Sequence, residues 1–120
     1  MIHLKKFAGK TFVTGFHGIG LVGFIAVDFM VRKLKAKRIG WAFSEDMPSV
    51  VFAGEELEMP VEFYEKGDLV FMKVNVIMER EVINRFLKEV VEHIGGKVKE
   101  IVVIGGLAIQ GRGVYGVANK

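Results

Sequence analysis

Apolar residues recur along this chain with periods that alternate between those of strands and helices. Apolar residues with amphipathic spacing at residues 79–94 predict one helix, whose apolar face is expected to include Val90 and Val91. A nearly continuous apolar run at residues 21–34 predicts another helix. The predicted strands cover residues 2–7, 11–15, 38–43, 50–53, 56–59, 61–64, 69–76, 100–104 and 112–118. We expect the strand at residues 100–104 to be buried. This order predicts an α/β fold, with a mixed, mainly parallel sheet and flanking helices, in a single domain of residues 1–120.

The helix predicted at residues 21–34 has no polar face, and Asp28 is its only charged residue before Arg32. A helix that is apolar all round is normally buried all round. A domain of 120 residues has one sheet to cover one side and little left to cover the other. We therefore expect this helix to contact another copy of the chain or another protein. The residues expected at that contact are Phe24, Val27, Phe29 and Met30.

Glycines are concentrated between the strand at residues 11–15 and this helix. Three of them match G-x-G-x-x-G in a strand–turn–helix context, which is typical of dinucleotide-binding turns. An acidic pair about 20 residues further on could bind a ribose, and two glycines after the strand at residues 100–104 would lie at the same sheet edge. The residues of such a site would be Gly15, Gly18, Gly20, Gly23, Glu45, Asp46, Gly105 and Gly106.

Two other interpretations of this segment stay open. Phe16 and His17 place bulk where a pyrophosphate needs close backbone approach, and no crossover helix follows the acidic pair. The same glycines also suit a tight turn that packs a helix closely on a sheet. Residues 12–31 are long enough to span a membrane, but the glycines and Asp28 disfavour a membrane helix. We therefore expect a packing turn, with a nucleotide or phosphate ligand as the alternative function.

The composition argues against several kinds of functional site. The chain has no cysteine, and its three histidines are scattered, with no H-x-x-x-H spacing and no cluster of carboxylates beside them, so we expect no metal site, no cofactor and no catalytic residues. Five cations lie within residues 32–38, but a basic helix end explains them without nucleic acid, because no aromatic residue alternates with them. We expect a cytoplasmic protein that binds neither nucleic acid nor membrane. Abundant Lys and Glu favour a thermophilic source.

Three motifs, in this order, resemble those of the archaeal proteasome assembly chaperone family. They are VTGFHGIGLVG at residues 13–23, SEDMP at residues 44–48 and IVVIGGL at residues 101–107. The resemblance covers nearly the whole chain. It implies a nucleoside-phosphorylase-like α/β fold without enzymatic activity. It also implies homo- or hetero-oligomers, with proteasome α subunits or a paralogous chaperone as partners.

The resemblance also has a point of departure. Some family members hold the α-ring through a C-terminal tail of hydrophobic residue, Tyr and any residue. This chain ends in Val117, Ala118, Asn119 and Lys120 instead, and its Val114-Tyr115-Gly116 is internal. We therefore expect the chain to correspond to the N-terminal part of the family domain, an incomplete domain in which direct docking into α-ring pockets is not predicted.

Overall fold

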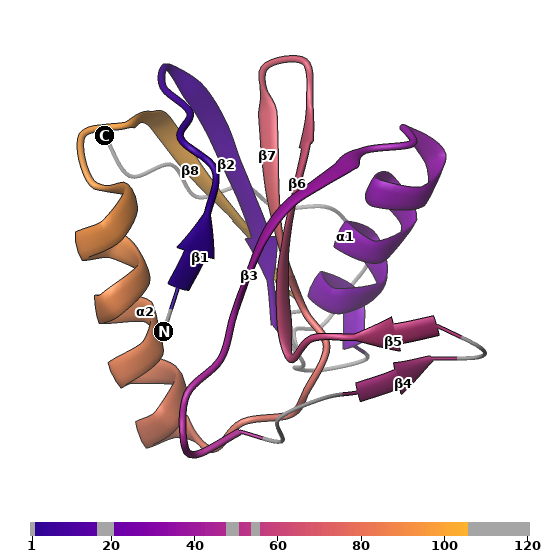
Figure 1. Cartoon of the computed structure of the whole chain (residues 1–120), viewed down its shortest axis with the longest axis vertical. Coiled ribbons are helices and arrows are strands. Elements are labelled where there is room, and N and C mark those ends of the chain that lie inside the picture. The colour runs from indigo at the N-terminus through magenta and orange to yellow at the C-terminus, as the bar shows by residue number, and fades with distance from the viewer. Residues whose placement is uncertain (1, 17–20, 48–50, 54–55, 106–120) are drawn as a thin grey trace, which may run out of the picture.

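The computed structural model describes residues 2–16, 21–47, 51–53 and 56–105, and Figure 1 shows its two helices beside a twisted sheet. The elements follow one another in the order that the sequence predicts. They are β1 (Ile2–Leu4), β2 (Lys10–Gly15), α1 (Val22–Lys33), β3 (Lys37–Ala42), β4 (Val51–Ala53), β5 (Glu56–Glu58), β6 (Val61–Lys66), β7 (Leu69–Val74), α2 (Arg80–Ile94) and β8 (Val98–Ile104).

Six strands form one sheet in the order β1-β3-β6-β7-β2-β8, and β4 and β5 pair as a separate antiparallel hairpin. In the described part of the main sheet, β2 is parallel to β7 and β8. The pairs β6–β7, β3–β6 and β1–β3 are antiparallel. The prediction of a mixed α/β sheet is confirmed. Parallel pairs are not the majority of neighbours, but β2, β3, β7 and β8 all run in the same direction.

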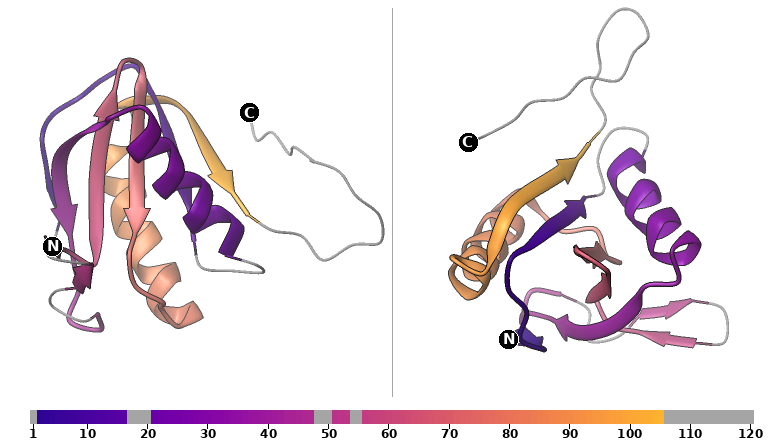
Figure 2. Two further views of the ribbon diagram at one scale, coloured as in Figure 1. Left: turned by 90° about the vertical axis from the view of Figure 1, so that its right-hand side faces the viewer. Right: turned by 90° about the horizontal axis from the view of Figure 1, so that it is seen from above.

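The two helices cover opposite faces of the sheet (Figure 2). The face under α2 has the larger core, in which Phe12, Phe63 and Met72 of the sheet meet Phe86 and Val90 of the helix. The face under α1 has a smaller core cluster of Val13, Val27, Val31 and Phe71. The two cores differ because α2 is amphipathic, whereas α1 buries only a narrow row of small and β-branched side chains.

That narrow row explains how α1 lies on the sheet. Its buried residues are Gly23, Val27 and Val31, which are spaced by four and therefore share one face of the helix. The helix ends after Lys33, where Lys35 has φ 53° and the Ala36 N–H donates to the Val31 carbonyl. This is the hydrogen-bond pattern of a Schellman cap, with a lysine where glycine is usual. The predicted helix is confirmed, but it is not buried on every side.

Two predictions of burial are wrong. Val91 was expected on the apolar face of α2, but it is 50% exposed, because Phe86, Val90 and Ile94 make the contact instead. The strand that contains β8 was expected to be buried. In the described part of the chain β8 lies at the edge of the sheet, with Ile101, Val102 and Val103 exposed.

Two further expectations concern the chain as a whole. The strand predicted at residues 112–118 lies outside the described residues. Of the helices described, none is both long enough and apolar enough to cross a membrane. Residues 12–31, the alternative membrane segment, contain most of β2 and the first ten residues of the 12-residue helix α1.

Candidate functional site

The glycine turn brings backbone against backbone at the ends of β2 and β8. A Cβ placed on Gly15 would lie 2.5 Å from the Gly23 carbonyl oxygen, and one placed on Gly23 would collide with the carbonyl oxygen of Ile104. Gly15 and Gly23 are therefore required by the protein's own packing, which lets the start of α1 sit directly on two strand ends. Gly105 has open space where a Cβ would point. Gly18, Gly20 and Gly106 lie outside the described residues.

The acidic pair of the nucleotide hypothesis does not reach this turn. β3, which precedes Glu45 and Asp46, is separated from β2 by β6 and β7. Three strand spacings amount to about 14 Å. Asp46 instead accepts a hydrogen bond from Arg85 of α2, with 2.9 Å between Nη2 and Oδ2. The structure therefore brings Gly15 and Gly23 together, but it leaves Glu45 and Asp46 on a different part of the sheet edge.

A chain of buried charges lies on the α1 face of the sheet. Lys73 of β7, only 4% exposed, has its Nζ 3.0 Å from Asp28 of α1 and 3.4 Å from Glu58 of the hairpin. Glu62 of β6, 1% exposed, is paired with Arg38 at 3.2 Å. Every one of these charges has a partner of opposite sign. The cluster therefore ties α1 and the hairpin to the sheet.

The protonation states within this cluster agree with a structural role. Burial opposes ionisation of Asp28, but hydrogen bonds and charges from Lys73 and Arg32 outweigh it and lower the pKa of Asp28. Burial, reinforced by the charge of Glu62, raises the pKa of Tyr64 to about 12. Asp28 is thus held as an anion and Tyr64 as a neutral phenol at neutral pH. Neither group has the pKa near 7 that a general base needs.

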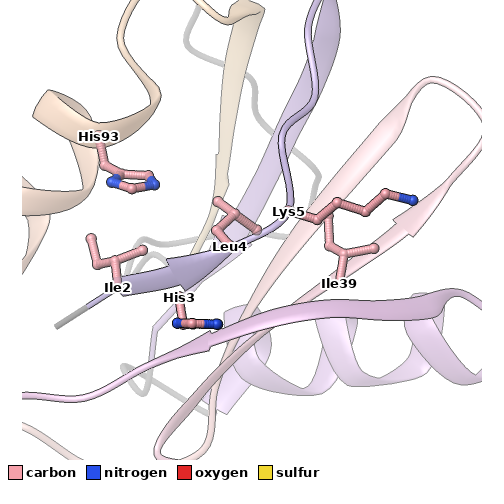
Figure 3. A pocket seen from close by; sticks show the side chains of 6 residues that line it. All are labelled: Ile2, His3, Leu4, Lys5, Ile39 and His93. Atoms are coloured by element: carbon pink, nitrogen blue, oxygen red, sulfur yellow. The ribbon is translucent and has the colours of Figure 1, made fainter.

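A shallow hollow beside β1 contains two of the three histidines. It has a volume of about 410 Å³ and is lined by Ile2, His3, Leu4, Lys5, Ile39 and His93. Figure 3 shows that His3 points to the opposite side of β1 from Ile2 and Leu4, away from His93. His3 stacks on Trp41 with ring centroids 5.1 Å apart. Within the described residues, no group of three or more metal-binding side chains occurs.

The most conspicuous surface feature is apolar. Leu21, Val22, Ile25 and Phe29 are 42%, 45%, 55% and 62% exposed. The spacing of three and four residues places Val22, Ile25 and Phe29 on one side of α1, and Leu21 directly precedes the helix. We refer to these four residues as the α1 surface. Contiguous apolar side chains at this level of exposure normally mark a contact with another protein or a membrane. Val102 of β8, which is 39% exposed, lies on the same side of the sheet.

The four residues predicted to form an intermolecular contact differ in their exposure to solvent. Phe29 lies at the C-terminal end of the α1 surface, and Phe24 and Met30 are partly exposed. Val27 is only 1% exposed and packs on Val13 and Phe71, so it belongs to the core and cannot contact another chain. Leu21, Val22 and Ile25 were not among the predicted contact residues. No sequence signal separates them from the buried residues, because the segment of residues 21–31 is apolar on every side except at Asp28.

These features define an α/β protein with a tightly packed glycine turn and a helix that exposes apolar side chains. The PAC2 family matches residues 12–120, and the chain belongs to this family. The resemblance to archaeal proteasome assembly chaperones is thereby confirmed. No match was found among curated protein sequences.

Solved structures share the fold. One is Pyrococcus furiosus PbaA, described as an archaeal homolog of proteasome-assembly chaperone, with a TM-score of 0.82 and 23% identity over 94% of this chain and 51% of that chain. Another is Pyrococcus furiosus PbaB, described as an archaeal proteasome activator, with a TM-score of 0.66 and 26% identity over 92% of this chain and 54% of that chain. A third is a Mycobacterium tuberculosis proteasome-assembly chaperone homologue, with a TM-score of 0.52 and 19% identity over 81% of this chain and 49% of that chain. The chain spans about half the length of these proteins.

Proposed function

We propose that this chain acts as a non-enzymatic, chaperone-like protein that holds other protein chains through its α1 surface. The exposed apolar row on α1 carries the proposal, because in the described part of the chain its side chains remain 42–62% exposed. The related structures are described as homologs of proteasome-assembly chaperones and as a proteasome activator. These descriptions support proteasome α subunits, a paralogous chaperone or a second copy of this chain as the molecules held.

The size of the surface suggests reversible binding. Burying a whole Leu, Ile or Phe side chain contributes about 1.5–3 kcal/mol, so a side chain that is half exposed has about 1 kcal/mol left to contribute. The four residues of the α1 surface together supply roughly 4 kcal/mol, which is comparable to the lower estimates of the entropic cost of association. Contact through α1 alone is therefore weak. Such a surface suits a protein that must release its partner after assembly.

The arrangement of polar groups supports a role without chemistry. The buried charges on the α1 face are paired with charges of opposite sign, and His3 and His93 lie on opposite sides of β1 (Figure 3). A catalytic site needs a nucleophile or a base within hydrogen-bond reach of a second polar group and of a space for substrate. The geometry around α1 favours binding over catalysis.

The test is binding to a recombinant archaeal proteasome α subunit, measured by native mass spectrometry and light scattering. We expect a complex with the unmodified chain and its loss in Phe29→Ser, because Phe29 is the most exposed residue of the α1 surface. Ile77→Ser is the matched control, since Ile77 is 79% exposed but lies outside α1. If Phe29→Ser binds the subunit as well as the unmodified chain does, the α1 surface is not the holding site.

A further inference from the structure

The α1 surface continues into positive charge. Counting by helical spacing from Phe29, positions three and four residues on are Arg32 and Lys33, so these two cations continue the apolar row. Lys35, which caps the helix, is exposed as well. We call Arg32, Lys33 and Lys35 the basic end of α1. The helix therefore presents an apolar row that ends in three exposed cations.

Little negative charge on α1 offsets this end. Asp28 is the one carboxylate of the helix, and it is already engaged by the Nε of Arg32 at 3.0 Å and by the buried Nζ of Lys73 at 3.0 Å. Within the described residues, no ion pair is recorded for Lys33 or Lys35. The first turn of α1 carries no acidic residue. It also has the partial positive charge of a helix N-terminus.

We infer that the α1 surface binds an acidic amphipathic helix of another protein, a helix with an apolar ridge flanked at one end by carboxylates. This inference rests on the proposed function and names the chemistry of its partner. The apolar ridge would cover Leu21, Val22, Ile25 and Phe29. The carboxylates would face the basic end of α1, where charge complementarity speeds association and excludes partners of the wrong sign.

A second copy of the chain does not fit the surface in a two-fold arrangement. If two α1 helices lay parallel, their basic ends would face each other. If they lay antiparallel, the basic end of one would face the N-terminus of the other, which is partially positive and has no acidic side chain. Both arrangements place like charges together, which disfavours the pairing.

Residues 106–120 of the same chain do not fit either. This segment contains Arg112 and Lys120 but no Asp or Glu. Its apolar residues could cover part of the α1 surface, but it brings no carboxylate to the basic end. Charge complementarity therefore favours an acidic segment of another protein over a two-fold pairing of α1 and over residues 106–120.

The experiment uses the 120-residue chain and three fluorescent helical peptides, each about 18 residues long, or about five helical turns. All three carry the same leucine ridge, and the flanking positions at one end are Glu, Gln or Lys. We expect fluorescence anisotropy to show binding roughly tenfold tighter for the Glu peptide than for the Gln peptide, because several exposed ion pairs each contribute modestly. We expect the Lys peptide to bind most weakly.

Variants separate the two parts of the surface. We expect the double variant Lys33→Glu and Lys35→Glu to reverse the preference, so that it binds the Lys peptide best. A double variant with the same change in net charge, Lys88→Glu and Lys97→Glu, should keep the original preference, because both residues are exposed but lie outside α1. Phe29→Ser should weaken binding of all three peptides.

Several outcomes would overturn the inference. Equal binding of the three peptides would show that charge does not select the partner, and a dimer that Phe29→Ser dissociates would show that a second copy covers α1. Binding of a single-stranded oligonucleotide that displaces the Glu peptide and is insensitive to Phe29→Ser would identify a nucleic-acid surface instead. The first two outcomes leave the proposed function standing. It fails separately if the proteasome α subunit binds Phe29→Ser as well as it binds the unmodified chain.

Discussion

Gly23 packs its backbone against the carbonyl oxygen of Ile104, and this contact leaves no room for a side chain. The backbone of Gly23 likewise leaves no room for a Cβ on Gly15. The spacing of these glycines along the sequence suits a phosphate-binding turn and a packing turn equally well. Only their contacts in the fold separate the two, because in the folded chain the space beside the glycines is occupied by backbone.

Gly23→Ala tests the packing role. In an exposed helix, replacing Gly by Ala stabilises by roughly 0.5–1 kcal/mol. Here we expect a net loss of about 1–3 kcal/mol, since the new methyl group meets a carbonyl oxygen that belongs to a paired strand. Urea unfolding followed by circular dichroism measures the difference. Gly105→Ala is the control and should be close to neutral, because a Cβ at Gly105 meets no described residue within 4 Å.

The same comparison limits what can be predicted at single residues. Gly15, at the end of a central strand, and the helix that follows were predictable from the pattern of apolar and β-branched residues. The inward direction of Val27 was not, because every neighbour of Val27 in the helix except Asp28 is also apolar. A uniformly apolar helix carries no periodicity from which its buried face can be read. The close contact between Gly23 and the Ile104 carbonyl oxygen determines which face of the helix lies on the sheet.

At the scale of elements, Lys73 connects α1 to the hairpin. Its ammonium group lies between Asp28 of α1 and Glu58 of β5, and only 5% of its side chain is exposed. A buried cation needs such partners, because an unpaired one would cost several kcal/mol in lost hydration. The sequence did not predict this cluster, since Asp28, Glu58 and Lys73 are far apart along the chain. Asp28 alone was conspicuous, as a single charge in an apolar helix.

Asp28→Asn tests this connection through its dependence on pH. The folded chain lowers the pKa of Asp28 below its ordinary value of 3.8. Its ionised form therefore contributes stability that is fully present above that value and is lost as the pH falls through the lower pKa of the folded state. We expect the variant to be less stable than the unmodified chain by about 1–3 kcal/mol at pH 7. The difference should shrink on acidification from about pH 5 to about pH 3.

Denaturant titrations at a series of pH values measure this difference. Asp46→Asn is the control, because Asp46 is paired with Arg85 on the surface, where such pairs contribute little. It should lower the stability by less than about 1 kcal/mol at pH 7. A constant difference between Asp28→Asn and the unmodified chain across this pH range would mean that the Asp28 carboxylate does not stabilise the fold through its charge.

For the whole molecule, the order of the strands decides which ligands the sheet edge can bind. The alternation of strands and helices was sufficient to predict an α/β fold, because each period is local. The placement of β3 beyond β6 and β7 was not predictable in the same way, since it depends on which strand pairs form across the chain. This placement carries Glu45 and Asp46 away from the glycine turn. The dinucleotide site that the sequence spacing indicated therefore lacks its acidic pair for the ribose.

The corresponding prediction concerns nucleotides and the thermal stability of the whole chain. A ligand at 100 times its dissociation constant stabilises the folded state by about 2.7 kcal/mol. For a domain near this size, each kcal/mol raises the midpoint of unfolding by roughly 4 °C, so a bound nucleotide would raise it by about 10 °C. We expect millimolar NAD or ATP to leave the midpoint unchanged in differential scanning fluorimetry, because the acidic pair and the glycine turn lie about three strands apart. A rise of several degrees that the double variant Glu45→Gln and Asp46→Asn removes would restore the nucleotide hypothesis. It would also require β3 to approach β2 in the bound state.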